Sequence, residues 1–436
     1  MTATDTPGIG FDPSSEAVQQ CPYPFYEAMR HDAPVLAIDG DRIGRGGETV
    51  YAVTRHEDVC RVARDWRTFS SRFGSPAAKP SPELAERLRA VTADGWPNVS
   101  TMLTEDPPSH WRYRGLVSRA FTPRRVRELE PEIRAICADL VNGFAQAPRV
   151  DFMAAFAVPL PIRAVAAVLG VPDTRQDDFK RWADMSVAAI GRAITDDARV
   201  EAERAIVEQQ HWFAGEIERR REEPQDDFLT ALLQAELPPE EQDEELGEMA
   251  EALPARLEMA EMLSIIRQIQ VAGSETTTSL MTDLMVQFAR HPDQWRRLRD
   301  EPDRIPTAVE EALRWASPNQ GLFRIATTDT EIAGTPIPAG ATVWVLFGSA
   351  NHDETVFADP EAFDPDRSEL HAHVAFGKGI HHCLGAALAR LEAQVAVETL
   401  VEAIDTIAVV DEASLRYAPS FLLRGLTSLE LDLTYR

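Results

Sequence analysis

The sequence predicts a mainly α protein with small β-sheets, and two observations lead to this fold class. Segments with the helical spacing of apolar residues occupy most of the 436 residues, whereas strand-like segments are few. The strand-like segments gather in three regions, 34–55, 325–347 and 418–435, and the remainder is α-rich. Because we see neither an internal repeat nor a low-complexity linker, we expect a single domain over residues 1–436.

Each expected element follows from its local pattern, in chain order. Apolar residues recur at helical spacing in segments 83–93, 110–119, 124–145, 161–168, 175–193, 199–222, 226–235, 255–290, 292–299, 305–315 and 384–402. Short runs rich in β-branched residues predict strands at 34–38, 50–53 and 341–346, and several more after residue 418.

Composition excludes some classes of partner. A net charge of −27 argues against nucleic acid and against an anionic membrane surface. No apolar run approaches the ~20 residues of a membrane span, and the N-terminus lacks the basic and apolar regions of a signal peptide. The four cysteines are widely scattered, which suggests a reduced compartment without a disulfide framework. We therefore expect a cytoplasmic monomer that binds no membrane.

Charge is uneven along the chain. Segment 236–251 is strongly acidic, and we interpret it as a solvated connector, with an acidic partner-binding segment as the alternative. Segment 109–127, by contrast, contains six arginines and no acid: Arg112, Arg114, Arg119, Arg124, Arg125 and Arg127.

One helix is unusually long. No proline interrupts the chain between Pro254 and Pro292, so a helix there could run on the order of 50 Å. Its apolar residues lie on more than one face, which is typical of a helix buried through the centre of a domain. The pattern breaks at Ala272-Gly273-Ser274-Glu275-Thr276-Thr277-Thr278, where glycine and threonine are poor helix formers. The break indicates either room for a ligand beside an acid and a hydroxyl, or a kink whose hydroxyls are satisfied internally.

Cys383 lies in a loop punctuated by glycines, Phe376-Gly377-Lys378-Gly379-Ile380-His381-His382-Cys383-Leu384-Gly385. A helical pattern follows directly, and a helix N-terminus favours a thiolate, the form of cysteine that binds metals. A lone cysteine is more often a small buried apolar residue. Zinc or non-haem iron bound with help from His371, His373, His381 and His382 is another alternative, although adjacent residues point in different directions and the chain has no CxxC.

The Cys383 loop closely resembles the haem-ligand loop of the cytochrome P450 family. Segment 272–278 resembles the oxygen-activation motif of the same family, Ala/Gly-Gly-x-Asp/Glu-Thr-Thr/Ser, and the two motifs follow in the family's order about 105 residues apart. The resemblance, which spans roughly residues 20–430, implies the cytochrome P450 fold, with the long central helix over the haem and the cysteine loop on its opposite face. It implies that Cys383 is the axial ligand of haem b and that Thr276 and Glu275 serve dioxygen binding and the proton relay. Haem contacts are also implied for Ala272, Gly273, Phe376 and Gly377.

Further haem contacts are implied at positions that match family segments. Asp106-Pro107-Pro108-Ser109-His110-x-x-x-Arg114 resembles the segment over the haem edge, and His110, Arg114, Arg324 and His381 would hold the haem carboxylates. Glu311-Ala312-Leu313-Arg314 resembles the family's Glu-x-x-Arg helix, and Arg367 would complete a buried structural cluster with Glu311 and Arg314. Ala350-Asn351-His352-Asp353-Glu354 departs from the commoner Ala-Asn-Arg-Asp-Pro, which we interpret as a loop variant.

The implied activity is that of a monooxygenase, which inserts one oxygen atom from O2 into an apolar organic substrate by hydroxylation or oxidative dealkylation. The chain lacks a dinucleotide fingerprint, so its electrons would come from a ferredoxin or flavodoxin with its reductase. Our hypothesis is that the arginines of 112–127 and Lys378 form a docking face for this acidic partner. A peroxide-using peroxygenase and a non-catalytic haem-binding protein are the alternatives; the acid–threonine pair argues against both.

The substrate is poorly determined by sequence. The segments expected to line its pocket are 72–104 with Trp96, Val99 and Met102, 175–215, Leu322-Phe323 and Phe421-Leu422. Their composition suggests an apolar molecule, and a terpenoid, a steroid, a fatty acid and an aromatic ether all fit equally well.

Overall fold

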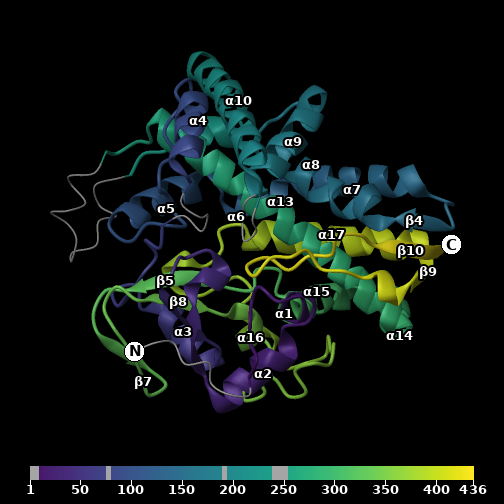
Figure 1. Cartoon of the computed structure of the whole chain (residues 1–436). Helices are drawn as coiled ribbons and strands as arrows, with labels where there is room; N and C mark the ends of the chain where they lie inside the picture. The colour runs from purple at the N-terminus through teal and green to yellow at the C-terminus, as the bar shows by residue number, and fades with distance from the viewer. Residues whose placement is uncertain (1–8, 75–79, 189–193, 238–253) are drawn as a thin grey trace. The chain divides into compact units, whose positions relative to one another are not determined.

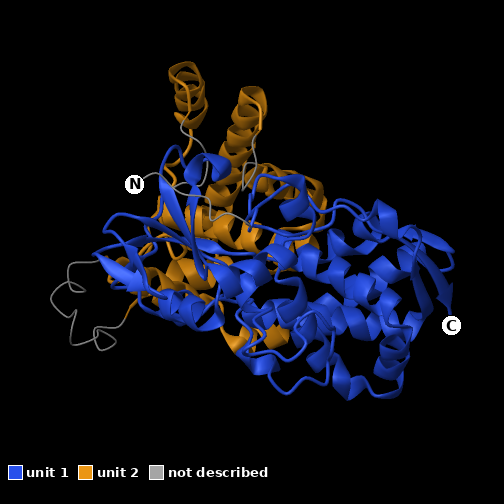
Figure 2. Cartoon of the chain, turned by 60° about the horizontal axis from the view of Figure 1, so that its bottom comes forward, with its two compact units in different colours: residues 1–76, 130–161, 275–436 blue, residues 77–129, 162–274 orange. Residues whose placement is uncertain are grey.

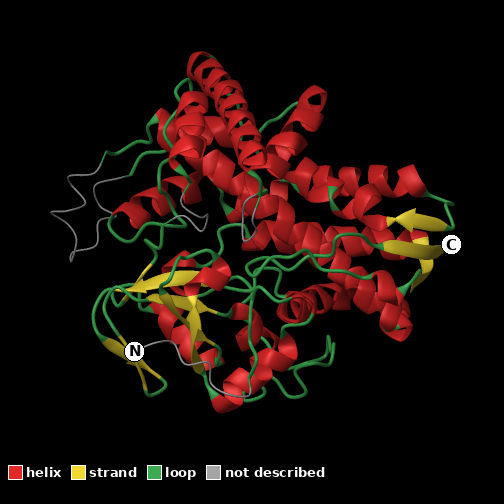
Figure 3. Cartoon of the chain, in the orientation of Figure 1, coloured by secondary structure: helices red, strands yellow, loops and turns green. Residues whose placement is uncertain are grey.

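The computed structural model describes residues 9–74, 80–188, 194–237 and 254–436, and in these it is mainly helical with small sheets (Figure 1, Figure 3). The chain divides into two compact units (Figure 2). Unit 1 comprises residues 1–76, 130–161 and 275–436, and unit 2 comprises residues 77–129 and 162–274. Most of the acidic segment 236–251 lies outside the described residues, so its interpretation as a connector stays a prediction.

The largest sheet lies in unit 1 and has the strand order β1-β2-β8-β5-β3. Strand β2 pairs antiparallel with β1 and parallel with β8, with Val50 opposite Thr342. The expected β regions 34–55 and 325–347 therefore join in one sheet, because their apolar side chains, such as Val53 and Val343, share a buried core. The strands are β1 (Val35–Asp39), β2 (Thr49–Val53), β3 (Phe69–Ser70), β5 (Leu322–Ala326) and β8 (Thr342–Val345).

Two smaller sheets complete the strands in the described part of unit 1. The first has the order β4-β10-β9, and the second is a hairpin of β6 and β7. Sequence patterns missed β4 and β9, since β4 has three residues and β9 continues directly from a helix. The bounds are β4 (Arg149–Asp151), β6 (Thr330–Ile332), β7 (Thr335–Ile337), β9 (Ile404–Val409) and β10 (Glu430–Tyr435).

Along the chain, the helices of unit 1 lie before and between these strands. Those before residue 65 were not predicted. The unit 1 helices are α1 (Glu16–Gln20), α2 (Tyr23–Asp32), α3 (His56–Arg64), α7 (Glu130–Phe144), α14 (Pro292–Asp300), α15 (Ile305–Ala316), α16 (Phe347–Ala350) and α17 (Ala386–Ala403). Short 3-10 turns include η6 (Leu370–Ala372) and η7 (Gly379–His381).

Unit 2 is built from helices in the residues that the structure describes. They are α4 (Pro82–Thr92), α5 (Ser109–Ala120), α6 (Pro123–Glu128), α9 (Gln176–Val187), α10 (Asp196–Glu222) and α11 (Phe228–Gln234). Helices α8 (Pro159–Val168) and α13 (Met259–Arg290) contribute residues to both units. Within the described ranges, no helix is both long and apolar enough to cross a membrane.

The single helix expected at 124–145 is wrong, because the chain turns at Leu129 and forms α6 and α7 instead. The hydroxyl of Thr122 caps α6 by accepting from the N–H of Arg125 at 3.2 Å. At the other end, the N–H of Leu129 donates to the Val126 carbonyl at 3.2 Å, which tightens and ends the helix. Pro131 then lies in the first turn of α7, where its missing N–H costs little.

Candidate functional site

The loop that carries Cys383 folds back on itself. The N–H of Cys383 donates to the carbonyl of Phe376 at 2.9 Å, and the N–H of Gly377 donates to Val374 at 2.8 Å. These bonds close the loop on its own backbone, while the Cys383 residue remains exposed. Helix α17 begins three residues beyond the cysteine, at Ala386.

Glycine is required where this loop meets α3. Gly379 has a φ of 74°, a left-handed conformation that side chains rarely adopt. A Cβ atom there would lie 2.6 Å from the carbonyl oxygen of Ala63 in α3. Gly377 is also left-handed, with a φ of 68°, but a Cβ there would meet nothing closer than 3.7 Å. The absence of a side chain at Gly379 therefore allows the backbone of the loop to pack directly against α3.

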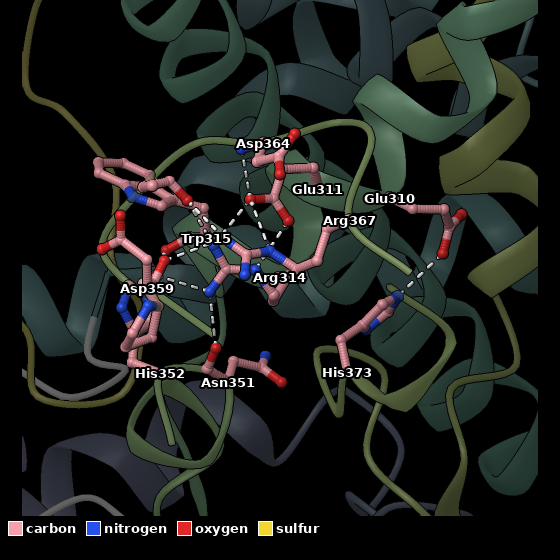
Figure 4. A network of polar contacts seen from close by, with 12 residues as sticks. Glu310, Glu311, Arg314, Trp315, Asn351, His352, Asp359, Asp364, Arg367 and His373 are labelled. Carbon is pink, nitrogen blue, oxygen red and sulfur yellow. Dashed lines mark hydrogen bonds and ion pairs between the residues drawn. The ribbon is translucent and has the colours of Figure 1, made fainter. Parts of the chain in front are cut away.

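The histidines near Cys383 do not converge on it as a metal site. His381 shares a hydrogen bond of 2.8 Å with the Ser71 hydroxyl, and His373 contacts Glu310 at 2.9 Å (Figure 4). Among the described residues, no three His, Cys, Asp or Glu side chains form a group that could hold a metal ion. One exposed thiol in a glycine loop fits haem, which would need a single protein ligand such as a Cys thiolate on its iron.

Helix α13 runs unbroken through the disturbed segment 272–278 and has one open stripe there. Ala272 is exposed, and Gly273, Glu275 and Thr276 are half-buried, whereas every residue from 277 to 288 is buried. Residues 272 and 276 are one turn apart on the same face. The stripe therefore presents a small side chain, a carboxylate and a hydroxyl next to a fully buried part of the helix, residues 277–288.

Three hydroxyls at this part of α13 donate to backbone carbonyls, and that of Thr278 reaches Ala157 at 3.1 Å. The hydroxyls of Ser274 and Ser279 donate to the carbonyls of Gln270 and Glu275, at 2.8 Å and 3.0 Å. A Cβ at Gly273 would lie 2.7 Å from a methyl group of Val165 in α8. Close packing against α8 thus accounts for the glycine, and bonds within the helix account for the two serine hydroxyls.

The residues implied to bind the haem carboxylates lie in both units. In unit 1, Arg324 is buried in β5, where its guanidinium donates to the Phe323 carbonyl at 2.7 Å, and His381 lies in η7. In unit 2, His110 and Arg114 lie one turn apart on α5, with His110 buried and Arg114 half-buried. Arginine and histidine can donate to carboxylates, so the chemistry of all four side chains fits the group.

Glu311, Arg314 and Arg367 come together in a buried cluster (Figure 4). Arg314 donates to both carboxylate oxygens of Glu311, at 2.7 Å and 2.8 Å, and neither side chain is exposed to solvent. Arg314 also donates to the carbonyls of Asn351, Pro360 and Ala362. Arg367 lies 3.5 Å from Glu311 and donates to the carbonyls of Asp359 and Ala362 at 3.0 Å. The cluster thereby fixes the backbone of segment 351–367.

Asn351 connects this cluster to the cysteine loop. Its side-chain amide donates to the hydroxyl of Ser317 at 2.8 Å, and its Oδ1 accepts from the N–H of Val374 at 2.7 Å. Asn351 is completely buried, so both bonds are shielded from water. Val374 is the residue whose carbonyl receives the N–H of Gly377.

His352, where the segment departs from the family pattern, has a clear structural role. Its ring stacks on Tyr23 with centroids 4.2 Å apart, and its nitrogens contact Glu361 at 2.8 Å and the Trp315 carbonyl at 3.0 Å. Burial lowers the pKa of His352, although the hydrogen bond to Glu361 opposes the change. The loop variant is thus a histidine packed into unit 1.

Sequence reasoning missed one charged cluster in unit 1. Glu310 binds both His373 and Arg390, and the Arg390 guanidinium lies over the ring of Phe376, 4.5 Å from its centroid. His373 and Arg390 lie 63 and 80 positions after Glu310 in the sequence, so no local pattern could pair them with it.

The expected docking face on 112–127 needs a correction at Arg112. This side chain is buried, and its guanidinium binds both oxygens of Glu261 at 2.7 Å and 2.8 Å and the carbonyls of Pro254 and Arg256 at 2.6 Å. Its charge is therefore used inside unit 2. Arg119, Arg124 and Arg127 are exposed, as expected of a surface.

The segments expected to line the substrate pocket are spread over both units. In unit 2, the backbone of Val99 donates to the Ser264 hydroxyl at 2.9 Å, and Met102 is buried. In unit 1, the rings of Phe323 and Phe421 lie 6.3 Å apart. Parts of both 72–104 and 175–215 lie outside the described residues.

Comparison with known proteins agrees with this geometry. The family model for cytochrome P450 matches residues 163–408. Cytochrome P450 107B1 of Saccharopolyspora erythraea is 39% identical over 98% of each chain. The mycinamicin IV hydroxylase/epoxidase of Micromonospora griseorubida is 36% identical over 89% of this chain and 90% of its own. The solved structure of cytochrome P450 CYP109Q5 from Chondromyces apiculatus superposes with a TM-score of 0.82, at 34% identity over 98% of each chain.

A mainly α fold with an exposed thiol in a glycine loop, together with these relatives, defines a haem-dependent monooxygenase. The chain belongs to the cytochrome P450 family. The match to CYP109Q5 covers both units, so the fold of that family extends over the chain.

Proposed function

We propose that the chain binds haem b through Cys383 and oxidises an apolar organic substrate with O2, by hydroxylation or oxidative dealkylation. Its electrons would come from a separate ferredoxin or flavodoxin with its reductase. The observation that carries the dioxygen route is the pair Glu275 and Thr276 on the open stripe of α13. A carboxylate beside a hydroxyl can pass protons to a group bound at that stripe.

Bound haem supplies the iron at which dioxygen is reduced and one oxygen atom is transferred to the substrate. The chain's own residues do the rest. Cys383 would ligate as a thiolate, with its backbone N–H already engaged by Phe376 at 2.9 Å. Arg324, His381, His110 and Arg114 would bind the two carboxylates of the haem. Ala272 leaves room beside α13, since its side chain is only a methyl group.

The apolar substrate is supported by the side chains of the implied lining segments. Trp96, Val99, Met102, Phe323 and Phe421 all offer apolar surface, and apolar pockets bind apolar molecules by removing that surface from water. We therefore propose an apolar organic molecule as the class of substrate.

The redox partner would meet unit 1 near the cysteine loop. Lys378 lies in that loop, and Arg64 of α3 is exposed, with its Cα 3.0 Å from where a Cβ of Gly379 would be. Two cations beside the ligand loop suit an acidic ferredoxin better than the buried Arg112 does. Lys378→Glu and Arg64→Glu should slow electron transfer from a [2Fe–2S] ferredoxin and weaken its dependence on salt. Arg149→Glu, at an exposed arginine of β4 that belongs to neither expected face, is the control, and equal rates in all variants would refute this face.

The dioxygen route is tested with Thr276→Ala. Terpenoids, steroids, fatty acids and aromatic ethers are first screened for a compound that converts the ferric haem to high spin, and this compound is the substrate of the test. The variant should bind that compound as before but divert reducing equivalents to hydrogen peroxide instead of product. Thr277→Ala is the matched control, because Thr277 is the adjacent residue and is buried. Unchanged coupling of electrons to product in Thr276→Ala would contradict the role of Thr276. Faster product formation with added peroxide than with O2 and electrons would favour a peroxygenase.

A further inference from the structure

The Glu310 carboxylate binds two polar neighbours of the Phe376 ring, Arg390 and His373. Glu310 in α15 binds Arg390 of α17 with both oxygens, at 2.5 Å and 2.9 Å, and its Oε2 also contacts Nε2 of His373 at 2.9 Å. Nδ1 of His373 accepts from the backbone N–H of Ala375 at 3.2 Å, so the ring proton facing Glu310 is on Nε2. The histidine therefore donates to the carboxylate.

The two groups that Glu310 holds both flank the same aromatic ring. The Arg390 guanidinium lies 4.5 Å from the Phe376 centroid, a cation–π distance, and the His373 ring is centred 6.1 Å away. Burial raises the pKa of Glu310, but the hydrogen bonds from His373 and Arg390 outweigh it and hold the pKa at about 2. The carboxylate is thus charged at neutral pH.

The Phe376 residue is also the backbone partner of Cys383. Its carbonyl accepts the Cys383 N–H at 2.9 Å, so a displacement of Phe376 moves the acceptor that fixes the backbone of the cysteine. Contacts therefore run from Glu310 through Arg390 and His373 to the Phe376 ring, and from the Phe376 carbonyl to Cys383.

We infer that Glu310 is a positioning residue for the cysteine loop, acting through Arg390 and His373 on Phe376. The inference rests on the proposed role of Cys383 as the haem ligand. It assigns to Glu310 an effect on the iron–sulfur bond that differs from the role of its neighbour Glu311, which fixes segment 351–367.

The test compares Glu310→Gln with Glu398→Gln in the haem-bound protein. Glu398 is the matched control, because it lies on α17 and pairs with Arg134 at 2.8 Å instead of with the loop. The measurements are the haem reduction potential and the rate at which the reduced, carbon monoxide-bound protein loses its red-shifted thiolate band. Glu310→Gln should raise that rate about tenfold, the factor for one lost charge-assisted hydrogen bond, and shift the potential. Glu398→Gln should change neither.

A double variant separates positioning from general stability. If Glu310 acts through the ring, Glu310→Gln should add nothing to the rate or the potential once Phe376→Leu has removed the ring. An undiminished effect in that background, or no effect in the original chain, overturns the inference. Arg390→Lys is the substitute if Glu310→Gln does not fold. It keeps the charge but loses the flat guanidinium over the ring, so it should change the rate and the potential in the way expected of Glu310→Gln. Absence of the thiolate band in the unaltered chain would refute Cys383 as the ligand.

Discussion

At the scale of single residues, the cysteine loop is shaped by two glycines with left-handed backbones. Gly379 and Gly377 share a left-handed conformation, but only Gly379 presses against the backbone of Ala63. A substitution at Gly377 therefore measures the free-energy cost of the left-handed backbone alone, and one at Gly379 adds the cost of a steric clash.

Gly379→Ala should impair haem binding far more than Gly377→Ala. Each substitution costs roughly 1 kcal/mol for the left-handed backbone, and the clash at residue 379 adds about 1–3 kcal/mol. Thermal denaturation and the haem content of the purified variants measure the difference. Equal losses in both variants would show that α3 moves away to accommodate the methyl group.

Asp283 makes the stability of unit 1 depend on pH. Burial raises the pKa of its carboxyl to about 6, although Arg424 and the Tyr417 hydroxyl, at 3.0 Å, favour the charged form. The folded pKa is above the unfolded value, so the stabilising contribution is complete below pH ~4 and is lost as pH rises through about 6. Asp283→Asn cannot ionise.

Relative to the unaltered chain, Asp283→Asn should therefore gain on the order of 2 kcal/mol in free energy of unfolding between pH ~4 and pH ~7. Urea denaturation at the two pH values measures this gain, and comparing the two differences cancels the fixed effect of the substitution on Arg424. If the difference in free energy of unfolding between Asp283→Asn and the unaltered chain were the same at both pH values, Asp283 would not ionise between them in the folded state.

Which site residues could be predicted depended on the range of their contacts. Glu311 and Arg314 are three residues apart on one helix, so a local pattern indicated their pairing. Cys383 was proposed as a ligand because of the glycines around it. The partner of Arg112 lies 149 residues away, and that of Arg390 lies 80 away. Charge patterning alone predicts that such arginines are solvated, and for this reason Arg112 was assigned to a surface.

At the scale of elements, Arg112 links α5 to the start of α13 inside unit 2. Four hydrogen bonds from one guanidinium reach Glu261 and the carbonyls of Pro254 and Arg256. Tyr113 adds a bond of 2.8 Å from its hydroxyl to Glu261. Helix α5 carries His110 and Arg114, so its anchoring bears on the implied haem contacts.

Arg112→Met should lower the free energy of unfolding by about 3–5 kcal/mol, because it leaves the partly buried Glu261 carboxylate without its cation. Arg124→Met removes an exposed pair with Glu128 and should cost at most about 1 kcal/mol. Urea denaturation monitored by circular dichroism distinguishes the two. A small loss in Arg112→Met would mean that water reaches Glu261 readily.

Long helices were predictable, and short or edge elements were not. Helix α13 carries many turns of apolar periodicity and runs from Met259 to Arg290, four residues shorter at its start than expected. Strand β4 has three residues, and helix α1 has five, so neither repeats its pattern enough to be recognised. The break at Leu129 was missed because the apolar pattern continues across it.

At the scale of the whole molecule, the net charge of −27 acts against compactness. Many of the chain's ion pairs are exposed, such as Arg149–Asp432 and Arg290–Glu412, and pairs of this kind contribute little. Repulsion among the excess acids should therefore dominate the response to salt.

Raising NaCl from roughly 0.01 M to roughly 0.15 M shortens the screening length from about 30 Å to about 8 Å. The Tm should rise by about 1–3 °C, since the unfolded chain suffers less repulsion than the folded one. Repeating the measurement near the isoelectric point is the control, because the effect should vanish there. A fall in Tm with salt would show that attractive pairs outweigh the net charge.

The supports of the cysteine loop also set an order of events during synthesis of the chain. Glu310 and Arg314 leave the ribosome before the carbonyls at 351–362, before His373 and before Arg390 of α17. Until α17 has emerged, the ring of Phe376 lacks the Arg390 guanidinium that contacts it. The contacts around Phe376, and through its carbonyl around Cys383, are therefore complete only after residue 390 has been synthesised.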